Sequence, residues 1–67
     1  MNIKVFNEKE NHHQTVEFLG TEMKELLKQL NINSETVLIV KNDAVVTIDE
    51  PLQDGDNIKL LSVISGG

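Results

Sequence analysis

The sequence has 67 residues and contains no cysteine, tryptophan, tyrosine or arginine. Without cysteine, a disulfide, a thiolate nucleophile or a cysteine-based zinc site is excluded. Small secreted domains usually depend on disulfides, so we expect a cytoplasmic protein. Met1 leads into Ile3-Lys4-Val5 without a basic stretch and an apolar run, so no signal peptide is predicted. No apolar segment has membrane-spanning length, and no membrane partner is expected.

Positive charge is also scarce. The chain has six lysines and eleven acidic residues, and its formal net charge is -5. This composition argues against nucleic acid, where arginine and a basic face supply most of the affinity. An acidic surface favours solubility, and a partner with a basic face is the alternative. We find no nucleophile–base pair, phosphate-cradling loop or metal-ligand spacing, and therefore expect a protein substrate rather than an enzyme.

Alternating apolar and polar residues predict two strands at the start of the chain. Met1 to Phe6 alternates, and Gln14 to Leu19 alternates again with Val16 and Phe18 on one face. The polar segment 7–13 between them is typical of a hairpin connection. We therefore expect these two strands to pair antiparallel.

A helix is predicted after Gly20, which breaks the second strand. Thr21 can cap the helix through its hydroxyl. Apolar residues follow at helical spacing and form one stripe suited to packing on a sheet. These residues are Met23, Leu26, Leu27 and Leu30.

Three further strands are predicted, over 36–41, 44–48 and 58–64, with turns at Asn42-Asp43 and Asp54-Gly55-Asp56. The run Val37–Val40 is apolar on both faces, so this strand is either covered twice or exposes a sticky surface. The element order predicts an α+β fold, a mixed sheet of about five strands packed against one main helix. We expect the first and last strands to pair in parallel at the centre of the sheet.

Several polar groups invite a site but have simpler interpretations. His12-His13 lacks a third ligand nearby in sequence, so solvent-exposed hairpin residues are favoured over a metal site. Asp54 and Asp56 flank Gly55 and are interpreted as turn formers that bond to backbone amides, rather than as paired catalytic acids. The acidic residues Asp43, Asp49 and Glu50 are interpreted as solvated surface.

The sequence closes on "ISGG", directly after an apolar strand. Glycine lacks a Cβ atom, so Gly66 and Gly67 can lie flat in a channel where a side chain would clash. Glycine also loses more conformational entropy on ordering than any other residue, so two glycines are unfavourable at the end of a strand. The alternative is an ordinary frayed terminus.

The segment "VTIDEPLQDGDNIKLLSVISGG" resembles the C-terminal third of the ubiquitin-like sulfur carriers, the thiamine-pathway carrier ThiS and the molybdopterin-pathway carrier MoaD. The resemblance covers the "DEPLQDGD" crossover and turn, the strand "NIKLL" and the terminal Gly66-Gly67. The helix "TEMKELLKQL" and the chain length also fit. It implies one β-grasp (ubiquitin-like) domain over residues 1–67 with a flexible Gly-Gly tail.

The resemblance also implies a chemistry centred on the carboxylate of Gly67. In the family, an ATP-dependent activating enzyme adenylates this glycine, and a sulfur donor converts the acyl-adenylate to a thiocarboxylate. A synthase then accepts the sulfur. Gly66 and Ser65 would thread the channel of the activating enzyme. No permanently bound cofactor is implied, only AMP and then sulfur attached at Gly67.

Two pathways and two other functions stay open. The crossover "TIDEPL" is more similar to the molybdopterin type and the ending "SVISGG" to the thiamine type. Lys41 and Asn42-Asp43 also depart from the family, which often has an apolar residue followed by Asn-Gly. The same Gly67 could form an isopeptide bond in a protein modifier, or the chain could be a non-conjugated interaction module.

A docking surface is predicted beside the tail. Ile58 and Leu60 are expected to face the helix, which turns Lys59 and Leu61 outward. An exposed aliphatic patch next to a functional tail suits a partner. The docking residues are predicted to be Lys59, Leu61, Val63 and Ile64, with Ile39 as the cross-strand neighbour of Leu61. The alternative is that Leu61, Val63 and Ile64 are ordinary strand residues covered by a loop.

Overall fold

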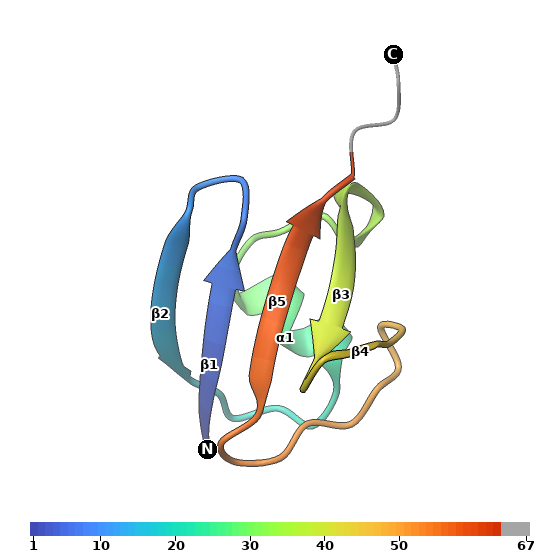
Figure 1. The fold of residues 1–67 in the computed structure, drawn as a ribbon. Coiled ribbons are helices and arrows are strands. Elements are labelled where there is room, and N and C mark those ends of the chain that lie inside the picture. The colour runs from blue at the N-terminus through green and yellow to red at the C-terminus, as the bar shows by residue number, and fades with distance from the viewer. Residues whose placement is uncertain (64–67) are drawn as a thin grey trace.

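The computed structural model describes residues 1–63, so the predicted tail residues Ser65, Gly66 and Gly67 and the predicted docking residue Ile64 lie outside it. One sheet forms the front layer in Figure 1 and a single helix, α1, crosses behind it. The elements are β1 (Asn2–Asn7), β2 (His12–Glu17), α1 (Met23–Gln29), the 3-10 turn η1 (Ser34–Thr36), β3 (Val37–Lys41), β4 (Ala44–Val45) and β5 (Asn57–Ser62).

The sheet has the strand order β2-β1-β5-β3-β4. β1 pairs antiparallel with β2 and parallel with β5, while β5 and β4 each pair antiparallel with β3. The last strand therefore lies at the centre beside the first, as predicted (Figure 1). Because β5 runs parallel to β1, the chain leaves β5 at the end of the sheet opposite Met1. The α+β arrangement of a mixed sheet and one helix is confirmed.

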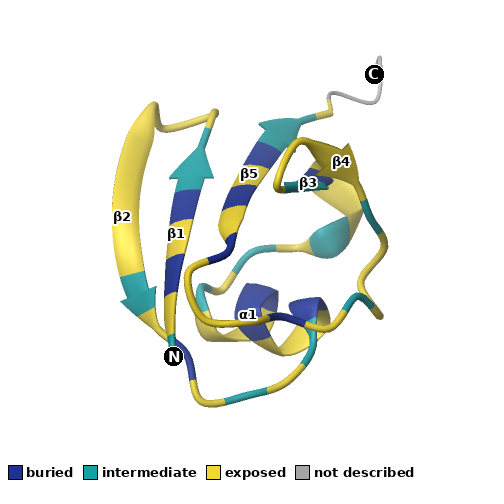
Figure 2. Ribbon diagram, turned by 60° about the horizontal axis from the view of Figure 1, so that its bottom comes forward, coloured by how far each residue is buried: buried dark blue, intermediate teal, exposed yellow. Residues whose placement is uncertain are grey.

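The core lies between the sheet and α1. β1 and β5 share the same alternation, with Ile3 and Val5 buried on one strand and Ile58 and Leu60 on the other (Figure 2). The predicted inward direction of Ile58 and Leu60 is confirmed. The other core residues are Phe18, Met23, Leu26, Leu27, Ile39 and Leu52.

The start of α1 differs from the prediction. The N-cap is Glu22 rather than Thr21, and the acceptor is the carboxylate of Glu25. Its Oε1 atom accepts hydrogen bonds from the Thr21 amide at 3.2 Å, the Thr21 hydroxyl at 3.0 Å and the Glu22 amide at 3.1 Å. These bonds, led by that from the Thr21 amide, hold the pKa of Glu25 below its ordinary value. Glu25 thus satisfies amides that would otherwise lack a partner at the helix start.

The crossover after β4 also differs from the prediction. The expected strand 44–48 pairs only over Ala44–Val45. Beyond it, the carbonyls of Ile48 and Glu50 accept hydrogen bonds from the amides of Lys24 and Met23, both at 2.9 Å. The crossover carbonyls therefore satisfy the first amides of α1, which ties this segment to the start of the helix.

The first hairpin is shifted relative to the prediction. β2 begins at His12 and ends at Glu17, so both histidines lie on an edge strand and not in a loop. Within residues 1–63, no helix is long and apolar enough to cross a membrane.

Candidate functional site

The sheet surface that faces away from α1 carries aliphatic side chains near the end of β5. Lys59 pairs with Val40 of β3 and Leu61 pairs with Leu38. Val40 in turn pairs with Val45 of β4. Leu38 is 40% exposed, Val45 is 66% exposed, and Leu61 is half-buried. We call Leu38, Val40, Val45 and Leu61 the outer patch.

The predicted position of Ile39 is wrong. Ile39 pairs with Leu60 rather than Leu61, and its side chain is 5% exposed in the core. Since side chains alternate along a strand, this one-residue difference in register moves Ile39 to the helix side and Leu38 to the outer side. The apolar run Val37–Val40 therefore has one buried face and one accessible face. Leu38, Val40 and Val45 lie in the outer patch but were not among the predicted docking residues.

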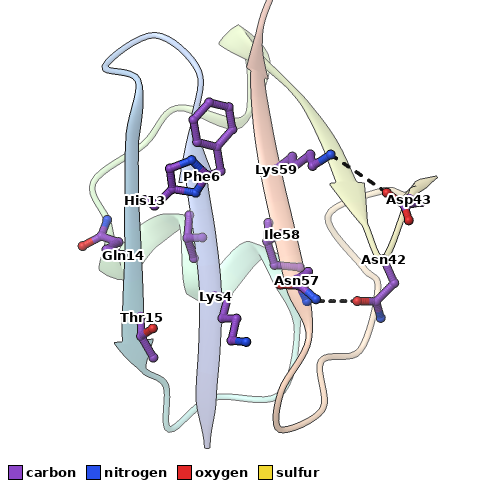
Figure 3. Close-up of a pocket in the computed structure, with 11 residues that line it drawn as sticks. Lys4, Phe6, His13, Gln14, Thr15, Asn42, Asp43, Asn57, Ile58 and Lys59 are labelled. Carbon is purple, nitrogen blue, oxygen red and sulfur yellow. Dashed lines mark hydrogen bonds and ion pairs between the residues drawn. The ribbon is translucent and has the colours of Figure 1, made fainter.

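A separate depression lies across β5, β1 and β2 and is lined by none of the outer-patch residues (Figure 3). At its edge, the ring of His13 packs on Phe6 with centroids 4.4 Å apart. Lys59 reaches toward Asp43 in the turn after β3, with Nζ and Oδ1 4.0 Å apart (Figure 3). Lys59 is exposed on this face, as predicted.

The base of the predicted tail is held from both sides. The Ser62 amide donates to the Glu8 carboxylate at 3.0 Å. The Val63 amide donates to the Thr36 carbonyl at 3.0 Å. Val63 lies just beyond β5 and is 50% exposed. The central strand thus delivers the chain to the edge of the outer patch, next to Leu61.

The turn before β5 uses its acids as backbone acceptors, as predicted. The Asn2 amide donates to Asp54 at 2.6 Å, and the Gln53 amide donates to Asp56 at 2.8 Å. Gly55 between them has a φ of 88°, a conformation that favours glycine. These aspartates shape the turn.

The interpretation of the remaining acids as solvated surface is only partly right. Asp49 and Asp43 are exposed. Glu50, however, is half-buried and lies 2.7 Å from the ammonium of Lys41, which also donates to the Pro51 carbonyl at 3.0 Å. Lys41 therefore ties the end of β3 to the crossover.

The strand order, the parallel β1–β5 pair and the crossing helix define a β-grasp domain. Two solved structures support this class. One chain in a complex of subunits 1 and 2 of the molybdopterin-converting factor from Helicobacter pylori matches with a TM-score of 0.74 and 25% identity. The match covers 100% of this chain and 100% of that one. A thiamine biosynthesis protein from Geobacter metallireducens matches with a TM-score of 0.66 and 27% identity, covering 100% of this chain and 88% of that one.

The sequence model of the ThiS family matches residues 3–67, and the chain belongs to this family. The sulfur carrier protein TtuB from Thermus thermophilus is 36% identical over 45 residues, which are 67% of this chain and 69% of TtuB. An uncharacterized protein from Archaeoglobus fulgidus is 42% identical over 52 residues, or 78% of this chain and 76% of that protein. The resemblance to the ubiquitin-like sulfur carriers is confirmed.

Proposed function

We propose that this chain is a sulfur carrier whose Gly67 carboxylate is the working group. An ATP-dependent activating enzyme adenylates Gly67, and a sulfur donor converts the product to a thiocarboxylate. Membership of the ThiS family and similarity to a protein named as a sulfur carrier support this proposal. The observation that carries it is the exit of the chain from the central strand at Ser62–Val63, beside the outer patch.

The chemistry explains why a carrier needs an activating enzyme. A carboxylate is a poor electrophile, so one of its oxygens first attacks the α-phosphate of ATP and pyrophosphate leaves. A hydrosulfide supplied by the sulfur donor then attacks the carbonyl carbon, AMP leaves, and loss of the proton gives the thiocarboxylate with no change of oxidation state. The thiocarboxylate formed is a nucleophile comparable to a thiolate, which this cysteine-free chain cannot otherwise supply. The protein acts as a co-substrate, with Ser65 and Gly66 threading the channel of the enzyme.

The partner surface is proposed to be the outer patch together with Lys59, Val63 and Ile64. The activating enzyme and a sulfur-accepting synthase would both bind close to the tail. The H. pylori relative was solved as a complex of two subunits of the molybdopterin-converting factor, which supports a protein acceptor. The G. metallireducens relative is named for thiamine biosynthesis, so both cofactor pathways remain candidates.

Intact-mass analysis of the protein from its native cell tests this function. A carrier shows the mass gain of one oxygen exchanged for sulfur, and deletion of Gly67 removes it. A ladder of larger adducts that depends on Gly67 would instead indicate a protein modifier. Absence of any modification, even after addition of activating enzyme, sulfur donor and ATP, would leave a non-conjugated interaction module and contradict the proposal.

A further inference from the structure

Glu8, in the turn between β1 and β2, contacts the last residue of β5 although 54 positions separate them. Its amide donates to the Leu60 carbonyl at 3.0 Å and so continues the β1–β5 ladder one residue past Asn7. Its own carbonyl accepts from the Asn11 amide at 3.1 Å, which closes the turn. The Glu8 main chain therefore belongs to both the sheet and the turn.

The Glu8 side chain completes the ladder that its main chain leaves unfinished. In a parallel pair, a residue donates to one residue of the neighbouring strand and accepts from the residue two positions further on. The Glu8 amide donates to the Leu60 carbonyl, so a regular ladder would have the Glu8 carbonyl accept from the Ser62 amide. The Glu8 carbonyl accepts from the Asn11 amide, and the carboxylate Oε1 is the atom that accepts from the Ser62 amide, at 3.0 Å.

The opposite side of β5 is fixed independently. Ser62 pairs with Val37 of β3, and the Val63 amide donates to the Thr36 carbonyl at 3.0 Å. Thr36 is itself braced, since its hydroxyl donates to the Asn33 carbonyl at 2.8 Å. The carboxylate of Glu8 thus holds the end of β5 from the β1 side, while β3 holds it from the other side.

We propose that Glu8 is a positioning residue that sets the direction in which the chain leaves β5 toward Gly67. This inference rests on the proposed carrier function. A tail whose base is already oriented loses less conformational freedom when its end enters an active site. Glu8 contacts the chain at Ser62, five positions before Gly67. Its effect would therefore pass through Ser62.

Three variants separate the hydrogen bond from charge. Glu8→Ala removes the acceptor, Glu8→Gln retains an acceptor oxygen, and Glu10→Ala removes a similar charge from the same turn. Glu8 and Glu10 are both exposed, so the fold should survive each change. Amide hydrogen exchange of the full chain, followed by NMR, measures the Ser62 bond directly, with the Leu60 amide as an internal reference.

In the exchange experiment, Glu8→Ala should accelerate exchange of the Ser62 amide about tenfold, the effect of losing one bond to a charged acceptor. Leu60 should be unaffected, Glu8→Gln should retain most of the protection, and Glu10→Ala should match the wild type. Wild-type exchange in Glu8→Ala would overturn the proposal. So would an equal acceleration in Glu10→Ala.

In ATP–pyrophosphate exchange with the activating enzyme, Glu8→Ala should lower kcat several-fold, because a smaller fraction of bound carriers has the tail in the reactive orientation. KM should change little, because the proposed docking surface is intact. Glu8→Gln should restore kcat. An unchanged kcat despite faster Ser62 exchange would overturn the positioning role. If the wild type itself is not adenylated, the proposed function fails, and the role of Glu8 in holding the tail base is still decided by amide exchange.

Discussion

Asn42 and Asp56 join the turn after β3 to the turn before β5 through a 2.9 Å hydrogen bond from Nδ2 to Oδ1. Asn42 also bonds to Asn57, accepting from its amide through Oδ1 at 2.9 Å and donating to its carbonyl at 2.8 Å. Asp56 is 8% exposed and also accepts from the Gln53 amide. The Asn42 side chain, in the turn after β3, therefore fixes the point at which the central strand β5 begins.

The first prediction concerns acid stability through Asp56. Burial alone would raise its pKa, but the hydrogen bonds from Asn42 and Gln53 and the nearby Lys41 charge outweigh it, so the pKa lies below its ordinary value of 3.8. A lowered folded-state pKa contributes stability that is complete above about pH 4 and is lost as pH falls through the folded value. Urea unfolding of Asp56→Asn should show a shallower loss of stability in that acid range.

At neutral pH, Asp56→Asn should also cost about 1–3 kcal/mol, because an amide nitrogen replaces one acceptor beside the Gln53 amide or Asn42. Asp54→Asn is the matched control, since Asp54 is an exposed acid of the same turn with one acceptor bond. An acid slope unchanged in Asp56→Asn, or changed equally in Asp54→Asn, would contradict this account.

Helices and strands could be predicted from the sequence because the spacing of apolar residues indicates which face of an element is buried. Alternation in β1 and β5 and the helical stripe from Met23 predicted the sheet, its central parallel pair and the crossing helix. Asn42-Asp43 predicted a turn, and the two residues have φ values of 48° and 71°, which asparagine and aspartate tolerate better than most residues. Where both faces of a strand are apolar, alternation carries no information, which is why Ile39 was assigned to the wrong side.

Side-chain contacts between turns and loops distant in sequence could not be predicted. The Glu8–Ser62 bond and the Lys41–Glu50 ion pair depend on which turns the fold places side by side. The role of Glu25 at the helix start is indicated locally by an acid three residues after the N-cap. Thr21, however, is an equally good N-cap candidate by sequence. The docking role of the outer patch remains a prediction.

The second prediction tests the core beneath α1. Leu27 is 2% exposed, so Leu27→Ala should lower the free energy of unfolding by about 2–5 kcal/mol. In a domain this small, such a loss is a large part of the total stability. Leu19 is 87% exposed, and Leu19→Ala should change stability by less than about 0.5 kcal/mol. Similar unfolding curves for the two variants would contradict the assigned core.

The third prediction separates two reasons for glycine. A Cβ atom at Gly20 would lie 2.7 Å from Cζ of the buried Phe18 ring, so Gly20→Ala should cost about 1–3 kcal/mol by overpacking. At Gly55 a Cβ atom meets nothing within 4 Å, but φ is 88°, so Gly55→Ala should cost about 1–2 kcal/mol by backbone strain.

Asparagine distinguishes the two cases because it tolerates positive φ better than alanine does. Gly55→Asn should recover part of the stability lost in Gly55→Ala, whereas Gly20→Asn should be no better than Gly20→Ala. Thermal unfolding of the four variants measures this. Recovery at Gly20 and not at Gly55 would reverse the assigned reasons.

The fourth prediction addresses the outer patch. Leu61→Asp and Leu38→Asp should each weaken binding of the activating enzyme at least about tenfold, because a charge then replaces an apolar contact. Both side chains are partly exposed, so each variant should stay folded. Leu19→Asp is the control, since Leu19 follows β2 at the end of the sheet opposite the exit of β5. Equal binding by all three variants, measured by calorimetry, would remove the patch as the docking surface.

The last prediction concerns the proposed tail. Gly66→Val should abolish ATP–pyrophosphate exchange, because its branched side chain would block a channel shaped for glycine. Thermal unfolding should be unchanged, since the core residues found within the described part of the chain, 1–63, lie between Ile3 and Leu60. A large loss of stability in Gly66→Val would show that the tail contributes to the fold, and full activity would show that adenylation does not require a bare glycine beside Gly67.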